Sequence, residues 1–240
     1  MKKRIIIIIL IILAIAVYLN RAYAWIYSRF DTLKQPDVIT MTVEKKEHNI
    51  KFIALGDSLT YGVGAENTTQ SWPAILAGKL SNNQTSVELT DLAVPGALSK
   101  DLIDSQLDAA IAAQPDLVTV LIGVNDLHNF IPQDIYRENL IYILSELKSK
   151  TKAKIVLINL PYLGTDSLLL PPYNLYFDLK TNNYNEELNK AADSLKLTPV
   201  DIHSTKKIFL SDKSYYAGDD FHPSAKGYEA WANLIYDAIQ

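Results

Sequence analysis

Short apolar runs alternate along this chain with longer segments in which apolar residues recur every three or four positions. The short runs are typical of buried strands, and the longer segments are typical of helices that pack on a sheet. The expected strands are 51–55, 86–92, 117–122, 154–159 and 197–200, and the expected helices are 72–80, 100–113, 132–150, 182–195 and 225–239. This alternation predicts an α/β protein, a three-layer α/β/α sandwich around a mainly parallel five-stranded sheet.

The amino terminus departs from this pattern. After the basic residues 2–4, residues 5–19 are fifteen consecutive positions without a charge. A helix of this length spans about 22 Å, which is less than the ~30 Å hydrocarbon layer of a membrane and suits a secretory signal peptide. Residues 22–24, Ala-Tyr-Ala, would offer a cleavage site.

Two features argue against cleavage of this leader. Arg21 lies directly before the small-residue site, and aromatic residues resemble an interfacial belt, at Tyr18, Tyr23, Trp25 and Tyr27. We therefore interpret residues 1–28 as an uncleaved transmembrane anchor, with a cleaved signal peptide as the alternative. Both interpretations keep the basic flank inside the cell and export the rest, as a single-pass membrane protein or as a secreted one.

The remaining chain divides into a linker and one domain. Residues 29–49 are polar, mixed in charge and without a clear period, which indicates a linker, and residues 50–240 are long enough for a single domain with a sizeable core. A formal charge of −4 without a Lys/Arg cluster argues against nucleic acid as the main partner. The absence of cysteine excludes disulfides and a thiolate nucleophile. The oligomeric state stays open, with a monomer as the working expectation.

Residues with catalytic chemistry follow the predicted strands. Ser58 lies just after strand 51–55, Asn125 follows strand 117–122, and Asp219 and His222 precede the last helix. Because the carboxyl ends of parallel strands share one edge of a sheet, these residues could gather there. A serine hydroxyl becomes a nucleophile when a base accepts its proton and hydrogen-bond donors stabilise the oxyanion that it creates.

Four short blocks in this region resemble the GDSL/SGNH hydrolase family. They are Gly56-Asp57-Ser58-Leu59, then Gly96, then Gly123-Val124-Asn125-Asp126, then Asp219 with His222-Pro223, in the order of the family. The resemblance spans residues 50–240, and the N-terminal segment makes the chain look like the exported or membrane-anchored bacterial esterases of that family. It implies the SGNH hydrolase fold, with a sheet of flavodoxin-like order.

The resemblance also implies a role for each residue. Ser58 would be the nucleophile, His222 its base and Asp219 the carboxylate that orients His222. Imidazole titrates near neutrality, so it can take the serine proton and return it to the leaving group, while the carboxylate fixes its tautomer. The oxyanion would be bound by the backbone N–H groups of Ser58 and Gly96 and by the side-chain amide of Asn125.

Plainer structural roles compete with these assignments. Ser58 alone could be the N-cap of a helix. Asp220 competes with Asp219 for the orienting role, although the spacing favours Asp219. Asp57 and Asp126 are expected to bond backbone groups within their own loops.

No cofactor and no metal ion are expected. Strand alternation followed by a loop explains Asp201 and His203 better than metal binding does. The segment Gly62-Val63-Gly64 lacks the third glycine of a dinucleotide-binding loop and is interpreted as a turn.

A long apolar insertion, residues 162–183, follows the fourth predicted strand. It is either a loop packed on the core, or a lid, an acyl-chain wall or a surface that enters the nearby bilayer. Because of this insertion, the sequence predicts a serine esterase that favours lipid or lysophospholipid acyl esters and acts through an acyl-serine intermediate. An O-acetyl esterase of cell-wall or extracellular glycan is the alternative, and a non-catalytic binding module on the same fold is the alternative of another class.

Overall fold

The computed structural model describes residues 2–27, 40–42, 48–162 and 164–240. Its strands are β1 (Thr40–Thr42), β2 (His48–Gly56), β3 (Thr85–Asp91), β4 (Leu117–Leu121) and β5 (Lys154–Leu157). Its α-helices are α1 (Lys2–Tyr27), α2 (Ser58–Tyr61), α3 (Trp72–Leu80), α4 (Ser99–Ser105), α5 (Leu107–Ala112), α6 (Val124–His128), α7 (Gln133–Lys150), α8 (Tyr173–Ser194), α9 (Lys206–Ser211) and α10 (Ala225–Ile239). Short 3₁₀ helices are η2 (Thr68–Gln70), η3 (His203–Thr205) and η4 (Lys213–Tyr215).

The strands form one sheet in the order β1-β3-β2-β4-β5. β1 runs antiparallel to β3, and the other neighbouring strands are parallel. Phe52 of the central strand β2 pairs with Leu89 of β3 on one side and with Leu117 of β4 on the other. The parallel strands therefore follow the flavodoxin-like order, and β2 carries the chain to the middle of the carboxyl edge, where ligands bind in such folds.

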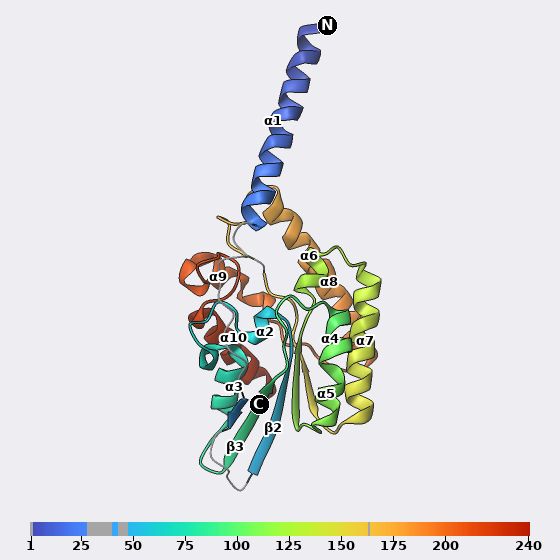
Figure 1. Ribbon diagram of the computed structural model, residues 1–240, viewed down its shortest axis with the longest axis vertical. Coiled ribbons are helices and arrows are strands. Elements are labelled where there is room, and N and C mark those ends of the chain that lie inside the picture. The colour runs from blue at the N-terminus through green and yellow to red at the C-terminus, as the bar shows by residue number, and fades with distance from the viewer. Residues whose placement is uncertain (1, 28–39, 43–47, 163) are drawn as a thin grey trace.

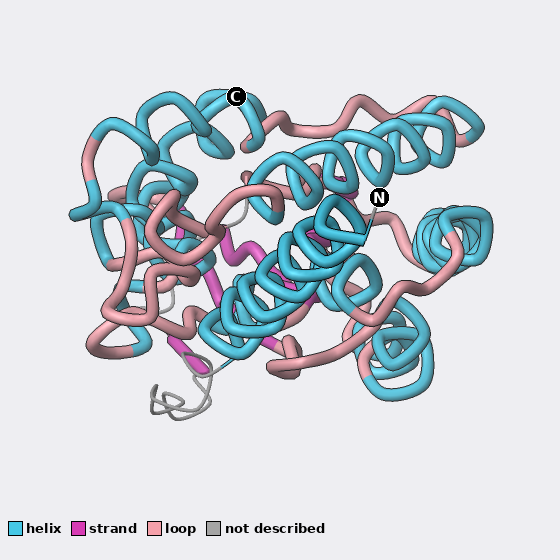
Figure 2. The backbone as a smooth tube through the Cα atoms, turned by 90° about the horizontal axis from the view of Figure 1, so that it is seen from above, coloured by secondary structure: helices cyan, strands magenta, loops and turns pink. Residues whose placement is uncertain are grey.

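Helices cover both faces of the sheet (Figures 1 and 2). α3 and α10 pack together on one face, and α7 packs against α4, α5 and α8 on the other. β4 is buried along its whole length, as a strand between two helical layers must be. Trp72 at the start of α3 and Trp231 in α10 are among the largest fully buried side chains, and they hold that helical layer in the core.

α1 projects from the domain beyond the layers that the other helices form (Figure 1). Its stretch Arg4–Trp25 has a mean hydropathy of 2.7 and, with 22 residues, is long enough to cross a membrane. By length and composition, this helix could be a membrane anchor or a signal sequence.

The sheet differs from the expected one at its edges. The predicted strand at 197–200 is wrong: within these described residues only Val200 pairs with the sheet, in a single parallel bridge. The fifth strand is β1, which lies inside the interval 29–49 that was expected to be a linker. Three residues at a sheet edge show no period, which explains why the pattern did not predict them. The parts of that interval at 29–39 and 43–47 lie outside the described residues.

The helices agree with the pattern at some positions and differ at others. α3 matches the prediction 72–80, and α10 matches 225–239, with Ser224 as its N-cap. The expected helix 100–113 is two helices, α4 and α5, that meet at Gln106. α8 begins at Tyr173, nine residues before the expected start at 182. Its first turns are apolar toward solvent as well as toward the core, which hides the helical period.

β3 ends at a buried acid, Asp91, which is 7% exposed and accepts the backbone N–H of Ala93 at 2.9 Å. Burial raises the pKa of Asp91 from 3.8 to about 7, and the Ala93 N–H opposes part of the rise. Because the folded-state pKa is above the unfolded one, the folded chain loses stability through this group as the pH rises from about 4 to about 7.

Asp91→Asn keeps an acceptor for the N–H of Ala93 but cannot ionise. We therefore expect it to stabilise the folded chain, relative to wild type, more at pH 8 than at pH 4. The difference in the free energy of unfolding between variant and wild type should be larger at pH 8 by on the order of 1–3 kcal/mol. Urea denaturation at both pH values measures it. Asp193→Asn, at an exposed acid on α8, is the control measured in the same way. The same value for Asp91→Asn at both pH values would contradict the prediction.

Candidate active site

Ser58 is the first residue of α2 and lies two positions past the end of β2. The N-cap of α2 is Asp57, whose Oδ1 accepts the backbone N–H of Leu59 at 3.0 Å. The capping role considered for Ser58 therefore belongs to Asp57, which bonds within its own loop as expected. The hydroxyl oxygen of Ser58 lies 3.0 Å from Nε2 of His222.

His222 and Asp219 extend the hydrogen-bonded chain that begins at Ser58. Nδ1 of His222 lies 2.5 Å from Oδ2 of Asp219, and both side chains are buried. The other carboxylate oxygen of Asp219 accepts the backbone N–H groups of Phe221 and His222, each at 3.0 Å. The turn that contains both residues therefore orients the carboxylate of Asp219 toward the imidazole of His222. Of the two neighbouring acids Asp219 and Asp220, it is Asp219 that bonds to the ring.

The environment of Asp219 favours its charged form. Burial acts against ionisation, but the hydrogen bond and charge of His222 and the two backbone N–H groups outweigh it, so the pKa of Asp219 lies below its usual value. A carboxylate at Nδ1 places the ring proton on that nitrogen. Nε2 of neutral His222 is then able to accept a proton from Ser58.

Asn125 lies in the first turn of α6, just after β4. Its Nδ2 donates to the carbonyl oxygen of Ala97 at 3.0 Å and lies 3.4 Å from Oδ2 of Asp57. Gly96, directly before Ala97, is exposed and has a φ of 83°, which glycine adopts without strain. A Cβ there would meet no atom within 4 Å, so the backbone conformation and not packing favours glycine. The structure thus brings Asn125 and the Gly96 loop together beside Asp57.

Asp57 is a buried acid next to the amide of Asn125. Burial raises the pKa of Asp57 from 3.8 to about 7, the N–H of Leu59 opposes the rise, and the charge of Asp126 adds to it. Near neutral pH a large share of Asp57 is therefore uncharged. This reduces the negative charge that the side chain of Asn125 experiences.

Asp126 bonds outside its own loop, contrary to the expectation. Its carboxylate oxygens accept the N–H and the hydroxyl of Ser99 at 2.8 and 2.5 Å, and Asn139 of α7 donates to the same hydroxyl at 2.9 Å. Tyr184 of α8 donates to the backbone carbonyl of Asp126 at 3.2 Å. This network joins α6, which carries Asn125, to three other helices. Its members are far apart in the sequence, so no local pattern indicated it.

Gln106, at the junction of α4 and α5, carries no motif and was not predicted as part of the site. Its side chain is buried, its Nε2 donates to the carbonyl of Gly56 at 2.8 Å, and its Oε1 accepts the N–H of the same residue at 3.0 Å. These bonds fix the peptide two positions before Ser58. Gln106 and Gly56 are 50 positions apart. The one local indication of their contact is a glutamine at a position of the helical segment that is buried, because a buried amide needs hydrogen-bond partners.

His128, at the end of α6, lies close to the candidate base. Its ring centroid is 5.5 Å from that of Phe221, the residue before His222. Burial lowers the pKa of His128 to about 4, and the proximity of His222 also lowers it. His128 is therefore neutral at physiological pH and adds no positive charge beside His222.

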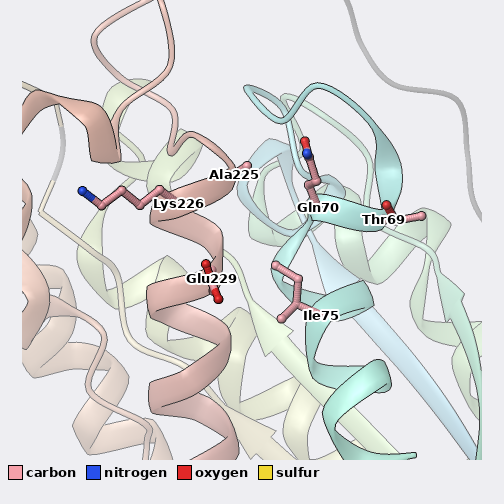
Figure 3. Close-up of a pocket in the computed structure, with 6 residues that line it drawn as sticks. All are labelled: Thr69, Gln70, Ile75, Ala225, Lys226 and Glu229. Atoms are coloured by element: carbon pink, nitrogen blue, oxygen red, sulfur yellow. The ribbon is translucent and has the colours of Figure 1, made fainter.

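A surface pocket lies between α10 and the segment of η2 and α3 (Figure 3). It is lined by Thr69, Gln70, Ile75, Ala225, Lys226 and Glu229. None of these residues belongs to the hydrogen-bonded chain of Ser58, His222 and Asp219, so the pocket is separate from the candidate site. Among the described residues, no group of three or more His, Asp or Glu side chains is placed to hold a metal ion.

Known proteins share both the sequence pattern and the fold. The model of the GDSL-like lipase/acylhydrolase family matches residues 54–230. The uncharacterized protein YpmR of Bacillus subtilis (strain 168) is 28% identical over 217 residues, which cover 81% of this chain and 83% of YpmR.

Two solved structures illustrate the shared fold. The structure of TesA has a TM-score of 0.66 at 19% identity and covers 79% of this chain and 98% of its own. That of Axe2, an acetylxylan esterase from Geobacillus stearothermophilus, has a TM-score of 0.63 at 20% identity and covers 81% of this chain and 96% of its own. At these identities the structures show the fold alone.

The fold and the family match define an ester-hydrolysing enzyme of the SGNH type. The matched residues make up well over half of the chain. The chain therefore belongs to the GDSL-like lipase/acylhydrolase family.

We expect Gln106→Leu to lower kcat for a soluble ester by about tenfold or more, with a smaller change in KM, because Ser58 loses its fixed position while substrate contacts stay. Initial rates with p-nitrophenyl butyrate measure both constants, and Tm is measured alongside.

Gln114→Leu is the matched control for this variant. Gln114 also donates to backbone carbonyls, those of Ile111 and Lys150. It precedes β4, so it lies at the amino ends of the strands, away from the candidate site. It should lose stability without losing kcat. Equal losses of kcat in the two variants would show that Gln106 has no specific positioning role.

Proposed function

We propose that this protein hydrolyses carboxylic esters with Ser58 as the nucleophile, His222 as the general base and Asp219 as the carboxylate that orients the ring. The observation that carries the proposal is the continuous chain of the three side chains, with 3.0 Å from Ser58 to His222 and 2.5 Å from His222 to Asp219. Such a chain at the carboxyl edge of a parallel sheet suits acyl transfer. Membership of an acylhydrolase family supports the same reaction.

In the first half of the reaction, Ser58 Oγ attacks the ester carbonyl carbon while Nε2 of His222 takes the hydroxyl proton. The carbonyl oxygen becomes an oxyanion. The tetrahedral intermediate collapses when His222 gives the proton to the leaving alkoxide, and the acyl group stays on Ser58. In the second half, water attacks the acyl carbon, its proton passes to His222, and the acid leaves as Ser58 regains the proton.

The proposed oxyanion donors are the backbone N–H groups of Ser58 and Gly96 and one N–H of the Asn125 amide. The amide carries two protons. One is donated to the carbonyl of Ala97 at 3.0 Å, whereas the contact with Asp57, at 3.4 Å, is long for a hydrogen bond. We assign this second N–H to the oxyanion. Each such donor is typically worth on the order of 3 kcal/mol in the transition state.

We place the domain outside the cytoplasmic membrane, held by α1 as a single-pass anchor. The basic residues 2–4 then stay in the cytoplasm, and Trp25 lies at the outer end of the span. The large apolar side chains of α1 between Ile5 and Val17 are 51–59% exposed, which supports a helix surrounded by lipid. Cleavage of this helix as a signal peptide is the alternative, and it would release a secreted enzyme.

Lipid or lysophospholipid acyl esters are the substrates that we favour. The start of α8 carries exposed apolar side chains. It lies close to the end of α1 (Figure 1), so the domain presents apolar surface next to the proposed anchor, which suits esters that reside in lipid. Glycan O-acetyl groups are the second candidate, supported by the shared fold with the acetylxylan esterase Axe2.

The catalytic assignment is tested by Ser58→Ala. We expect the full-length wild type in detergent to hydrolyse p-nitrophenyl acetate or butyrate and the variant to lose at least about 10³-fold in kcat, because no acyl-serine can form. Ser105→Ala, on α4, is the control and should keep its activity. Undiminished activity of Ser58→Ala would overturn the assignment. An inert wild type across acyl lengths would favour a binding module.

A panel of esters separates the two substrate classes. We expect kcat/KM for long-chain p-nitrophenyl esters and lysophosphatidylcholine to exceed that for acetylated xylo-oligosaccharides by about tenfold or more, since each buried methylene adds transition-state binding. A preference of similar size for the acetylated sugar would support the glycan esterase instead.

A further inference from the structure

The first turns of α8 are apolar on two opposite faces. Phe177, Thr181 and Tyr184 are buried, whereas Leu175 and Leu179 are 72% and 59% exposed. Successive helix residues are about 100° apart, so Leu175 and Leu179 share one side and the buried residues share the other. A helix that only packs on a sheet has one apolar face. Leu175 and Leu179 therefore form a second apolar surface on the outer side of the helix.

The chain segment that leads into α8 lies against the last turns of α1 (Figure 1). Three hydrogen bonds join the two: the Tyr18 hydroxyl donates to the carbonyl of Pro171 (2.7 Å), the Tyr173 hydroxyl to the carbonyl of Leu19 (3.2 Å), and Trp25 Nε1 to the carbonyl of Ser167 (3.2 Å). Ala22, between these positions of α1, is buried at 3% exposure. The contact is thus a packed one along almost two turns of α1.

The apolar stretch of α1 sets the depth of this contact. A hydrocarbon layer of ~30 Å takes up about 20 helical residues, which fits the stretch Arg4–Trp25. Arg21, near the outer end of this stretch, would extend its charged group to the lipid headgroups. Tyr18 lies seven residues before Trp25, or about 10 Å along the helix. The segment bonded to Tyr18 and Leu19 would then lie well below the outer end of the span.

We propose that residues 167–179, here called the entry segment, lie within the outer leaflet of a lipid bilayer beside α1. The proposal rests on the proposed anchoring of the chain by α1. Leu175 would lie deeper in the leaflet than Leu179, which is one turn closer to the domain. Lipid is the occupant because the apolar side chains of α1 and Leu175 are all exposed, and a protein partner would have to cover both elements.

The backbone of the entry segment suits a medium without water. Pro171 and Pro172 have no N–H to satisfy. The N–H of Tyr173 is bonded to the carbonyl of Leu170 at 2.8 Å, and the carbonyl of Pro171 accepts the hydroxyl of Tyr18. These bonds give part of the segment the internal partners that polar backbone groups need in lipid. Charged groups flank the segment at both ends: Asp178 lies on its domain side, and Nζ of Lys213 donates to the hydroxyl of Ser167 at 3.1 Å.

Aromatic rings connect the entry segment with the candidate catalytic histidine. The ring centroid of Phe177 lies 5.2 Å from that of His128, His128 lies 5.5 Å from Phe221, and Phe221 lies 5.0 Å from His222. The lipid-facing helix is therefore also part of the wall beside the site. An ester whose acyl chain remains in the leaflet approaches Ser58 from this side. The entry segment accordingly selects esters that reside in the membrane over those dissolved in water.

Fluorescence quenching by lipid tests this depth directly. The chain has no cysteine, so each single-cysteine variant carries one unique thiol for the fluorophore NBD. The variants are Leu175→Cys, Leu179→Cys, Ile12→Cys within α1, and Tyr142→Cys, a control on α7 whose native side chain is 50% exposed. Each full-length protein is reconstituted into phosphatidylcholine vesicles with and without brominated acyl chains. We expect strong loss of emission at Ile12 and Leu175, a weaker loss at Leu179 and none at Tyr142.

The quenching results distinguish the depth of the entry segment from the anchoring of the chain by α1. Quenching at Ile12 without quenching at Leu175 overturns the inference and leaves the anchor in place. Absence of quenching at both positions overturns the inference together with the anchoring. Hydrolysis of soluble p-nitrophenyl butyrate by the same proteins reports independently on the catalytic assignment.

An activity assay tests the consequence for substrate. Leu175→Glu is expected to lower hydrolysis of an ester embedded in vesicles while leaving hydrolysis of p-nitrophenyl butyrate unchanged, because it places a charge in the leaflet. Tyr142→Glu should change neither rate. Equal losses on both substrates, or none on the embedded one, would contradict the selective role of the entry segment.

Discussion

The hydrogen bond between Ser58 and His222 is the contact on which the rest of this structure depends, and it joins residues 164 positions apart. The sheet places one partner and α10 the other. Tyr228 of α10 donates its hydroxyl to the carbonyl of Val63 at 2.6 Å, which ties the turn after α2 to the helix that follows His222. Gly64 allows the close approach, because a Cβ there would lie 2.5 Å from the carbonyl oxygen of the residue after His222. A larger residue at this position would separate the two partners.

Around this contact the fold buries polar groups that a hydrocarbon core would exclude. Asp57, Gln106 and Asp126 are each about 1% exposed, and each is hydrogen-bonded to a backbone group that lies in the first turn of a helix or at a strand end near the site. A buried polar group that loses its partner costs about 1–3 kcal/mol, so these bonds hold the loops in one arrangement. The site is therefore rigid before any substrate arrives, which electrostatic stabilisation of an oxyanion requires.

The sequence was informative wherever a structural feature depends on residues close together in the chain. The buried run of β4 and the helix 72–80 are such features, and the structure has both. Features that depend on distant partners could not be predicted: β1 pairs only through β3, and Gln106 bonds Gly56 across 50 positions. The early start of α8 was missed because its exposed leucines break the one-faced pattern of a core helix. The structure places the site residues close together, and their catalytic roles stay predictions.

Three hydrogen bonds hold the domain against the end of α1, at Ser167, Pro171 and Tyr173. Under the proposed anchoring, a domain held at three points would pivot little about α1, so Ser58 would stay at a nearly constant height relative to the membrane plane. Encounters with a substrate dissolved in that plane then take place by lateral diffusion in two dimensions. Turnover would follow the number of substrate molecules per unit of membrane area and not their concentration in bulk water. Anchored in this way, the domain would reach groups near the membrane and not a polymer far outside it.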